Sequence, residues 1–221
     1  MNAAKFLYSL TLSFLLLFTF GCASFSGFST GRTIGKGAGE INGNATLVET
    51  PDFSVNDTAE IFPTLRIPVL ELGGRYGILD RLDAGLRIST TANIYFDAKF
   101  QFIGDQESLF AASIGAGAGG VLGGTIPIVN VQVPLYFSVH PNEKLHIYFS
   151  PRFIHQRLPQ INKIVGGLNY TGGNIGILFG KEFKFGVEVS NYKLFGSGGR
   201  TEIDFEKRNL TNLGLGMSYT F

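Results

Sequence analysis

The residues best suited to chemistry are the three histidines, His140, His146 and His155. A histidine next to a serine can activate the serine hydroxyl as a nucleophile for hydrolysis. A serine two positions from the histidine on one strand would lie on the same face, but the residue at that spacing after His146 is Tyr148. Ser150 is four positions away, about 13 Å along an extended strand, which is too far for direct contact. The spacing therefore disfavours a catalytic triad, and we expect no catalytic residue and no enzyme activity.

Eight charged residues occupy positions that alternate with apolar or small neighbours, and four are acids and four are bases. An ion-selective channel would place charges of one sign at its constriction. The balanced set instead predicts ion pairs that fill a narrow interior, with a gated pore or a polar binding site as alternatives. The eight residues are Glu71, Arg75, Asp83, Arg87, Asp97, Lys99, Arg152 and Glu188.

Composition excludes several other kinds of site. The single cysteine, Cys22, excludes an internal disulfide and a zinc site built from several cysteines, and we expect no cofactor and no metal. Lys5 is the only charged residue before Cys22, so the remainder has 17 bases, one fewer than the 18 of the whole chain, against 17 acids. This neutral balance gives no basic surface for nucleic acid.

The elements that must position these side chains are segments of about ten residues in which apolar residues recur at every second position. Turn residues separate the segments, which predicts an all-β, closed antiparallel transmembrane barrel of ten strands, with eight strands as the alternative. Pro68 predicts a bulge in its strand. The expected strands include 40–48, 65–78, 82–90 and 210–221. The clearest internal strand is the fourth, in which Ile94, Phe96, Ala98, Phe100 and Phe102 alternate with polar residues.

Closure of the barrel has a physical reason. In hydrocarbon every backbone N–H and C=O must be paired inside the protein, and only helices and closed barrels achieve this. The main alternative architecture is a water-soluble sandwich of two sheets.

The final stretch has its large residues on one face: Leu213, Leu215, Met217, Tyr219 and Phe221. Glycine, serine and threonine occupy the other face. The stretch resembles the C-terminal strand of bacterial outer-membrane β-barrels, in which a terminal Phe and an aromatic residue two positions earlier form a signal for the barrel assembly machinery. The resemblance implies a location in the bacterial cell outer membrane. It also implies outer-membrane lipid, lipopolysaccharide and the assembly machinery as partners.

The N-terminus has the pattern of an export signal, because Lys5 precedes an apolar run from Phe6 to Phe20. The following Gly21-Cys22-Ala23-Ser24 resembles a bacterial lipoprotein cleavage site, which would make Cys22 the lipidated first residue. Cleavage near Ala23 or Ser24 by the ordinary signal peptidase, or a retained membrane anchor, are alternatives. The expected organisation is a signal peptide over 1–21, a flexible leader over 22–39 and the barrel over 40–221.

The connections predict how the barrel is oriented. Tight turns alternate with longer loops, so we expect the turns and both termini on the periplasmic side and the loops 49–63, 156–165 and 195–209 outside. The most favoured function is structural or binding, in a barrel with a narrow lumen filled by side chains. A small pore or transporter for small or apolar solutes is the alternative, and a lipid-modifying outer-membrane enzyme is less favoured.

Overall fold

The computed structural model describes residues 24–50, 53–54, 60–62, 65–121, 128–157, 167–197 and 209–221. The expected signal peptide and Cys22 fall outside these residues. Within the described part, no helix is long and apolar enough to cross a membrane.

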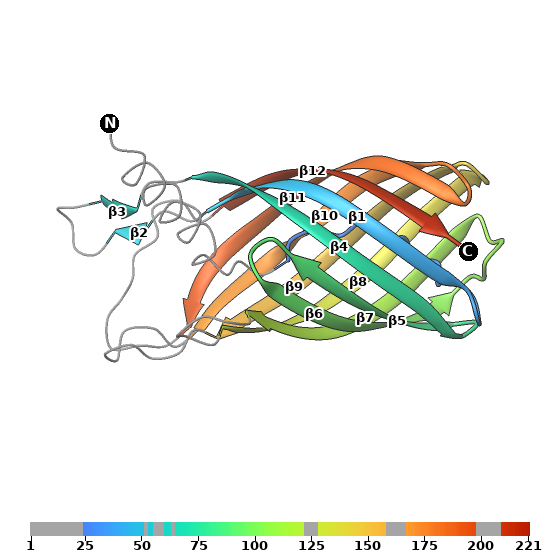
Figure 1. The fold of residues 1–221 in the computed structure, drawn as a ribbon, viewed down its shortest axis with the longest axis horizontal. Helices are drawn as coiled ribbons and strands as arrows, with labels where there is room; N and C mark the ends of the chain where they lie inside the picture. The colour runs from blue at the N-terminus through green and yellow to red at the C-terminus, as the bar shows by residue number, and fades with distance from the viewer. Residues whose placement is uncertain are drawn as a thin grey trace, which may run out of the picture.

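Ten strands form one closed antiparallel barrel, and two short strands form a separate two-stranded sheet in the connection that follows the first strand (Figure 1). The barrel strands are β1 (Gly39–Glu49), β4 (Arg66–Leu79), β5 (Leu82–Ser89), β6 (Asn93–Ile103), β7 (Phe110–Val121), β8 (Val129–Asn142), β9 (Leu145–Arg157), β10 (Gly167–Phe179), β11 (Phe183–Ser197) and β12 (Asn209–Thr220). The small sheet pairs β2 (Phe53–Ser54) with β3 (Glu60–Phe62).

The first and last barrel strands pair with each other, which closes the cylinder. Ala45 of β1 is opposite Leu215 of β12 on one side and opposite Leu70 of β4 on the other. Every strand of the barrel therefore has two hydrogen-bonded neighbours, as hydrocarbon requires. The predicted closed barrel of ten strands is confirmed, and the alternative of eight strands is wrong.

Large apolar side chains cover the outer wall. Leu72 is 71% exposed, Leu215 is 63% exposed and Phe96 is 60% exposed, whereas Glu71, next to Leu72, is 4% exposed. A polar interior inside an apolar wall is the reverse of a soluble core and is what a barrel in lipid needs. The sandwich alternative is wrong, and we treat the ten strands as membrane-spanning.

The two ends of the barrel differ, and we name them the turn end and the loop end. The turn end holds the connections after β4, β6, β8 and β10, together with Gly39 and Phe221, whose backbones are hydrogen-bonded to each other. The loop end holds the remaining connections. Figure 1 shows the C-terminus at the end opposite the small β2–β3 sheet.

The bulge predicted at Pro68 is absent from the pairing of β1 with β4. Pro68 pairs with Leu47 in an uninterrupted ladder between β1 and β4. The pairing of β4 with β5 starts only at Glu71, so the missing N–H of Pro68 breaks no ladder with β5. The irregularity of β4 lies instead between Gly77 and Leu79, beside the turn.

The segment from Ser24 to Ala38, here called the leader, is the largest departure from expectation. The sequence predicts a flexible leader that precedes the barrel, but residues 24–38 run inside the lumen and are hydrogen-bonded to its wall. Ser24, Ser26 and Thr33 are each at most 5% exposed. Gly77 of β4 receives the end of the leader, since the Gly77 N–H donates to the Ala38 carbonyl and the Gly37 N–H donates to the Gly77 carbonyl. A side chain at position 77 would collide with the carbonyl oxygen of Gly35.

Replacing Val187 with arginine tests whether the outer wall faces lipid. Val187 is 52% exposed on β11, opposite Leu215. An arginine near the bilayer midplane costs about 2–4 kcal/mol. We expect a loss of that order in the free energy of unfolding, measured by denaturant titration in lipid vesicles. Val187→Leu is the matched control, and an unchanged stability for the arginine variant would contradict a lipid-facing wall.

Candidate functional site

The lumen is filled in three layers, and the layer nearest the loop end is apolar. We call it the apolar cap. Phe25 of the leader contributes an edge-on contact to Tyr170, with 5.2 Å between ring centroids, and a tilted contact to Tyr192 at 5.0 Å. Strands β1, β4 and β9 to β12 supply the other members, so the cap fills the loop end of the lumen along that part of the wall with hydrophobic packing. The members of the cap are Phe25, Val48, Val69, Ile154, Leu168, Tyr170, Tyr192, Leu194 and Leu210.

The middle layer contains an ion-pair network on β4, β5 and β6. Arg75 donates to the carboxylates of Asp83 and Asp97, with an N–O distance of 2.5 Å to Asp97. Lys99 lies 3.6 Å from Asp83, and Arg87 lies 3.9 Å from Asp97. The structure thus brings five of the eight charged residues selected from the sequence into one cluster. The cluster contains three cations and two carboxylates in contact with one another, so it presents no constriction of one sign.

The other three charged residues also lie inside but have different partners. The Glu188 carboxylate accepts hydrogen bonds from Tyr148 at 2.7 Å, from the Asn174 amide at 2.8 Å and from the Gly27 backbone N–H at 2.9 Å. Arg152 is 3% exposed, and its Nη1 donates to the Ser26 carbonyl at 3.0 Å.

Glu71, at 4% exposed, completes the set of eight and accepts a 3.3 Å hydrogen bond from the side-chain amide of Asn44. Neither Glu71 nor Glu188 forms an ion pair within 4 Å among the described residues. The wall therefore uses these two carboxylates as hydrogen-bond acceptors.

The leader follows the lumen by hydrogen-bonding its backbone to side chains of the wall. Lys99 donates to the carbonyls of Arg32 at 2.7 Å and Thr30 at 3.3 Å. The side-chain oxygen of Gln101, Oε1, accepts from the Thr33 backbone N–H at 2.8 Å. In a β-strand the backbone N–H and C=O groups pair with those of a neighbouring strand. In the leader they are paired with side chains of the barrel wall instead.

Glycines of the last strand make room for the leader. A Cβ added to Gly216 would lie 2.6 Å from the Phe28 ring, and one added to Gly214 would lie 3.1 Å from it. The small face of β12 thus seats an aromatic side chain of the leader. The opposite face of β12 carries the expected assembly signal, and all five of its residues are exposed on the outer wall: Leu213, Leu215, Met217, Tyr219 and Phe221.

A chain of three side chains lies between the middle layer and the turn end. Nε2 of His146 is 2.9 Å from the Gly180 carbonyl, which can only accept, so His146 carries its proton on Nε2. Nδ1 of His146 must then accept from Nδ1–H of His140, at 2.7 Å. This leaves Nε2 of His140 to accept from the hydroxyl of Ser138, at 2.8 Å. The geometry is that of a serine next to an oriented base.

The leader occupies the position that a substrate would need at this serine. The Gly31 backbone N–H donates to Ser138 Oγ at 2.9 Å, and the Gly31 carbonyl accepts from Ser113. Ser138 is 2% exposed. In this state the Ser138–His140–His146 relay holds the leader and does not present a nucleophile.

Sequence reasoning missed Ser138, although its spacing from His140 was available as a signal. The residue two positions after His146 is Tyr148, which cannot take that role. Ser138 precedes His140 by two residues on β8, so both point into the lumen. The third histidine, His155, bonds to Asn169 at 2.8 Å and takes no part in the relay.

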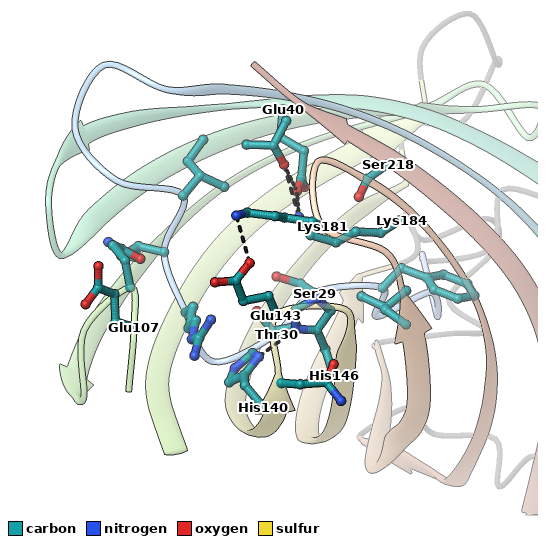
Figure 2. Close-up of a pocket in the computed structure, with 18 of the residues that line it drawn as sticks. Ser29, Thr30, Glu40, Glu107, His140, Glu143, His146, Lys181, Lys184 and Ser218 are labelled. Atoms are coloured by element: carbon teal, nitrogen blue, oxygen red, sulfur yellow. Dashed lines mark hydrogen bonds and ion pairs between the residues drawn. The ribbon is translucent and has the colours of Figure 1, made fainter. Parts of the chain in front are cut away.

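The third layer is a vestibule at the turn end, with a volume of about 780 Å³. Figure 2 shows His140 and His146 on its wall, with two lysine–glutamate pairs near them. Lys181 lies 2.8 Å from Glu143, and Lys184 lies 3.5 Å from Glu40. The walls carry both signs of charge and so suit a polar molecule better than a fatty one.

The groups at the rim of the vestibule are exposed and weakly coupled. The hydrogen bond from Lys181 lowers the pKa of the Glu143 carboxyl, and the same contact raises the pKa of the Lys181 ammonium. Solvent screens this pair, so its contribution to stability is small. Among the described residues, no group of three or more His, Cys, Asp or Glu side chains is arranged to hold a metal ion.

Replacing Arg75 with methionine tests the ion-pair network. The change leaves Asp83 and Asp97 buried without their main partner, and breaking a buried pair in this way costs about 3–5 kcal/mol. We expect a loss of that order in the free energy of unfolding. Lys181→Met at the exposed Glu143 pair is the control and should change stability little. Equal effects of the two substitutions would contradict the network.

Labelling with a fluorophosphonate tests whether Ser138 is available as a nucleophile. We expect no labelling of the folded protein, because the leader backbone at Gly31 covers the hydroxyl. The measurement is mass spectrometry of the intact chain beside a Ser138→Ala control. A label present on the natural chain and lost in the control would show that the serine is reactive.

No family model matches the chain, and no curated protein matches it. Many solved structures do match in fold. The outer membrane protease OmpT of Escherichia coli is 10% identical, with a TM-score of 0.41, over 90% of this chain and 100% of that one. OprG of Pseudomonas aeruginosa, an outer membrane protein, is 12% identical, with a TM-score of 0.37, over 87% and 99%.

The Yersinia pestis outer membrane protein Ail is 10% identical, with a TM-score of 0.34, over 84% of this chain and 100% of that one. These structural neighbours are bacterial outer-membrane proteins with diverse activities. At such identities they share an architecture with this chain and do not assign it a function.

Proposed function

We propose that this protein is an integral outer-membrane barrel with a structural or binding role, whose lumen is closed by its own leader. The observation that carries the proposal is the course of the leader. It runs from Phe25 in the apolar cap to Ala38 beside Gly77, with wall side chains bonded to its backbone along the way. An interior filled in this manner supports a rigid barrel better than a channel.

The proposed location is the bacterial outer membrane, with the turn end in the periplasm. The exposed apolar wall supports insertion in a bilayer, and the exposed aromatic face of β12 leaves the expected assembly signal accessible from outside the barrel. Short turns on the periplasmic side and longer loops outside are the usual arrangement of such barrels. Binding would then occur at the vestibule or at the outer loops.

The course of the leader also changes where the N-terminal end is expected. The sequence places both ends of the chain at the turn end. In the structure Phe221 lies there, whereas Phe25 packs in the apolar cap near the loop end. Cys22 is three residues before Phe25, a span of at most about 11 Å. We propose that a lipid on Cys22, if attached, would be held on the outer side.

Surface accessibility of an epitope fused directly after Ala23 would test this arrangement. We expect antibody to label the epitope on intact cells without permeabilisation, because the leader carries it through the lumen. An epitope fused after Phe221 at the turn end is the control and should be labelled only after permeabilisation. The reverse pattern would contradict the proposed threading.

A small pore is the second candidate, favoured by the polar character of the wall beneath the leader. Gln101, Gln132 and Asn174 are fully buried, and each would face water if the leader moved. Polar side chains of the wall hydrogen-bond to the leader along most of its length. If the leader were displaced, these side chains would line a hydrophilic path through the barrel. The pore therefore requires the leader to move out of the lumen, whereas the structural or binding role does not.

Conductance in planar bilayers separates the two candidates. We expect no stable current from the natural chain. In Gly31→Val the added Cβ would lie 2.3 Å from the Ala111 carbonyl oxygen, so the leader must shift and current should appear. Lys36→Ala, at an exposed position of the leader, is the control and should remain closed. A stable current through the natural chain would contradict the closed lumen.

A further inference from the structure

A small cavity of about 20 Å³ lies between the leader and the barrel wall. One water needs at least about 10–15 Å³, so the space fits a single water or a single monoatomic ion. The leader contributes Ser26 to its lining, and the wall contributes three arginines from different strands. The arginines are Arg75 on β4, Arg87 on β5 and Arg152 on β9.

The lining carries buried donors with unmet hydrogen-bonding capacity. Among the described residues, Nε and Nη2 of Arg152, Nε of Arg87 and the hydroxyl of Ser26 have no hydrogen-bond partner. Asn44 contributes the only acceptor of this kind in the lining, its side-chain oxygen. A buried polar group without a partner is costly, so this set favours an occupant that accepts hydrogen bonds.

The charges around the cavity also favour an occupant that accepts hydrogen bonds. Arg75 is paired with both aspartates of the ion-pair network, but Arg152, 3% exposed, has no carboxylate within 4 Å among the described residues. The one acid in the lining, Glu40, is engaged by Lys184 and by the Thr220 hydroxyl. Glu188 attracts Arg152 only from beyond that distance, and a buried cation with no carboxylate in direct contact is less favourable than one in a direct ion pair.

We propose that this cavity binds a monoatomic inorganic anion of chloride size. Such an anion would accept from the unpaired donors of Arg152, Arg87 and Ser26 and would give the Arg152 guanidinium a direct anionic contact. A water molecule would serve less well, because it carries no charge and only the Asn44 side-chain oxygen among the unpaired lining atoms could accept one of its two protons. Ser26 belongs to the leader and both arginines belong to the wall, so the anion fastens the leader to the barrel.

The test is bromide, used as a heavy chloride substitute, in crystals of the full refolded chain. We expect an anomalous peak in the cavity, within hydrogen-bonding distance of Arg152 and Ser26. Arg152→Gln should remove the peak. Arg66→Gln is the matched control, since the Arg66 side chain is 72% exposed, pairs with Glu49 and does not line the cavity. This peak should persist in the control.

Ser26→Ala provides a milder variant in case Arg152→Gln does not fold, and it should lower the bromide occupancy. In solution, the unfolding temperature of the natural chain should rise and saturate with bromide at constant ionic strength set with gluconate, as binding to the folded state requires. Water density without an anomalous peak would overturn the proposal. A peak that survives Arg152→Gln, or unfolding temperatures independent of bromide, would also overturn it. None of these outcomes bears on whether the lumen conducts.

Discussion

Pairing of the backbone inside a hydrocarbon solvent is the constraint on which this structure depends. A lipid-exposed strand edge would leave N–H and C=O groups without partners, and no water is present to replace them. The pairing of β1 with both β12 and β4 removes the edge. Once closed, the barrel separates two environments, and side chains sort by alternation along each strand into a lipid-facing set and an interior set.

Closure also creates an interior that the chain must fill from its own residues. Charges on neighbouring strands are arranged so that Arg75 meets two aspartates, which reduces the cost of burying all three. The leader fills the rest of the space. Its backbone supplies donors and acceptors to wall side chains such as Glu188 and Lys99. Hydrophobic packing around Phe25 fills part of the loop end, whereas the turn end keeps a polar vestibule.

The barrel could be predicted from sequence because lipid imposes a strict period of two. The alternation of Phe96, Ala98 and Phe100 with Asp97 and Lys99 defines which side chains face inward, and five of the eight selected charges meet in one cluster. The leader could not be predicted in the same way. Its backbone forms no strand, and its partners come from distant positions, so Ser-, Gly- and Thr-rich composition alone does not distinguish a bound segment from a mobile one.

Other departures have similarly local causes. Strand β10 spans Gly167–Phe179. Gly172 and Gly173 within it weaken the apolar alternation by which strands are recognised, so its first half is hard to identify from sequence. The Ser138–His140 spacing was present in the sequence, but only the structure shows that His146 completes the relay and that Gly31 covers it. The arginine-lined cavity depends on the position of the leader and leaves no sequence pattern.

Cross-linking of the first and last strands tests the central claim most directly. Cysteines at Ala45 and Leu215, which face each other in the register, should form an intramolecular disulfide in high yield in membranes, with Cys22 replaced by serine. A pair at Ala45 and Phe221 is the control and should link poorly. Closure predicts that the linked chain resists the change in gel migration on heating. Disulfides formed only between chains, or equal yields for both pairs, would contradict a closed barrel.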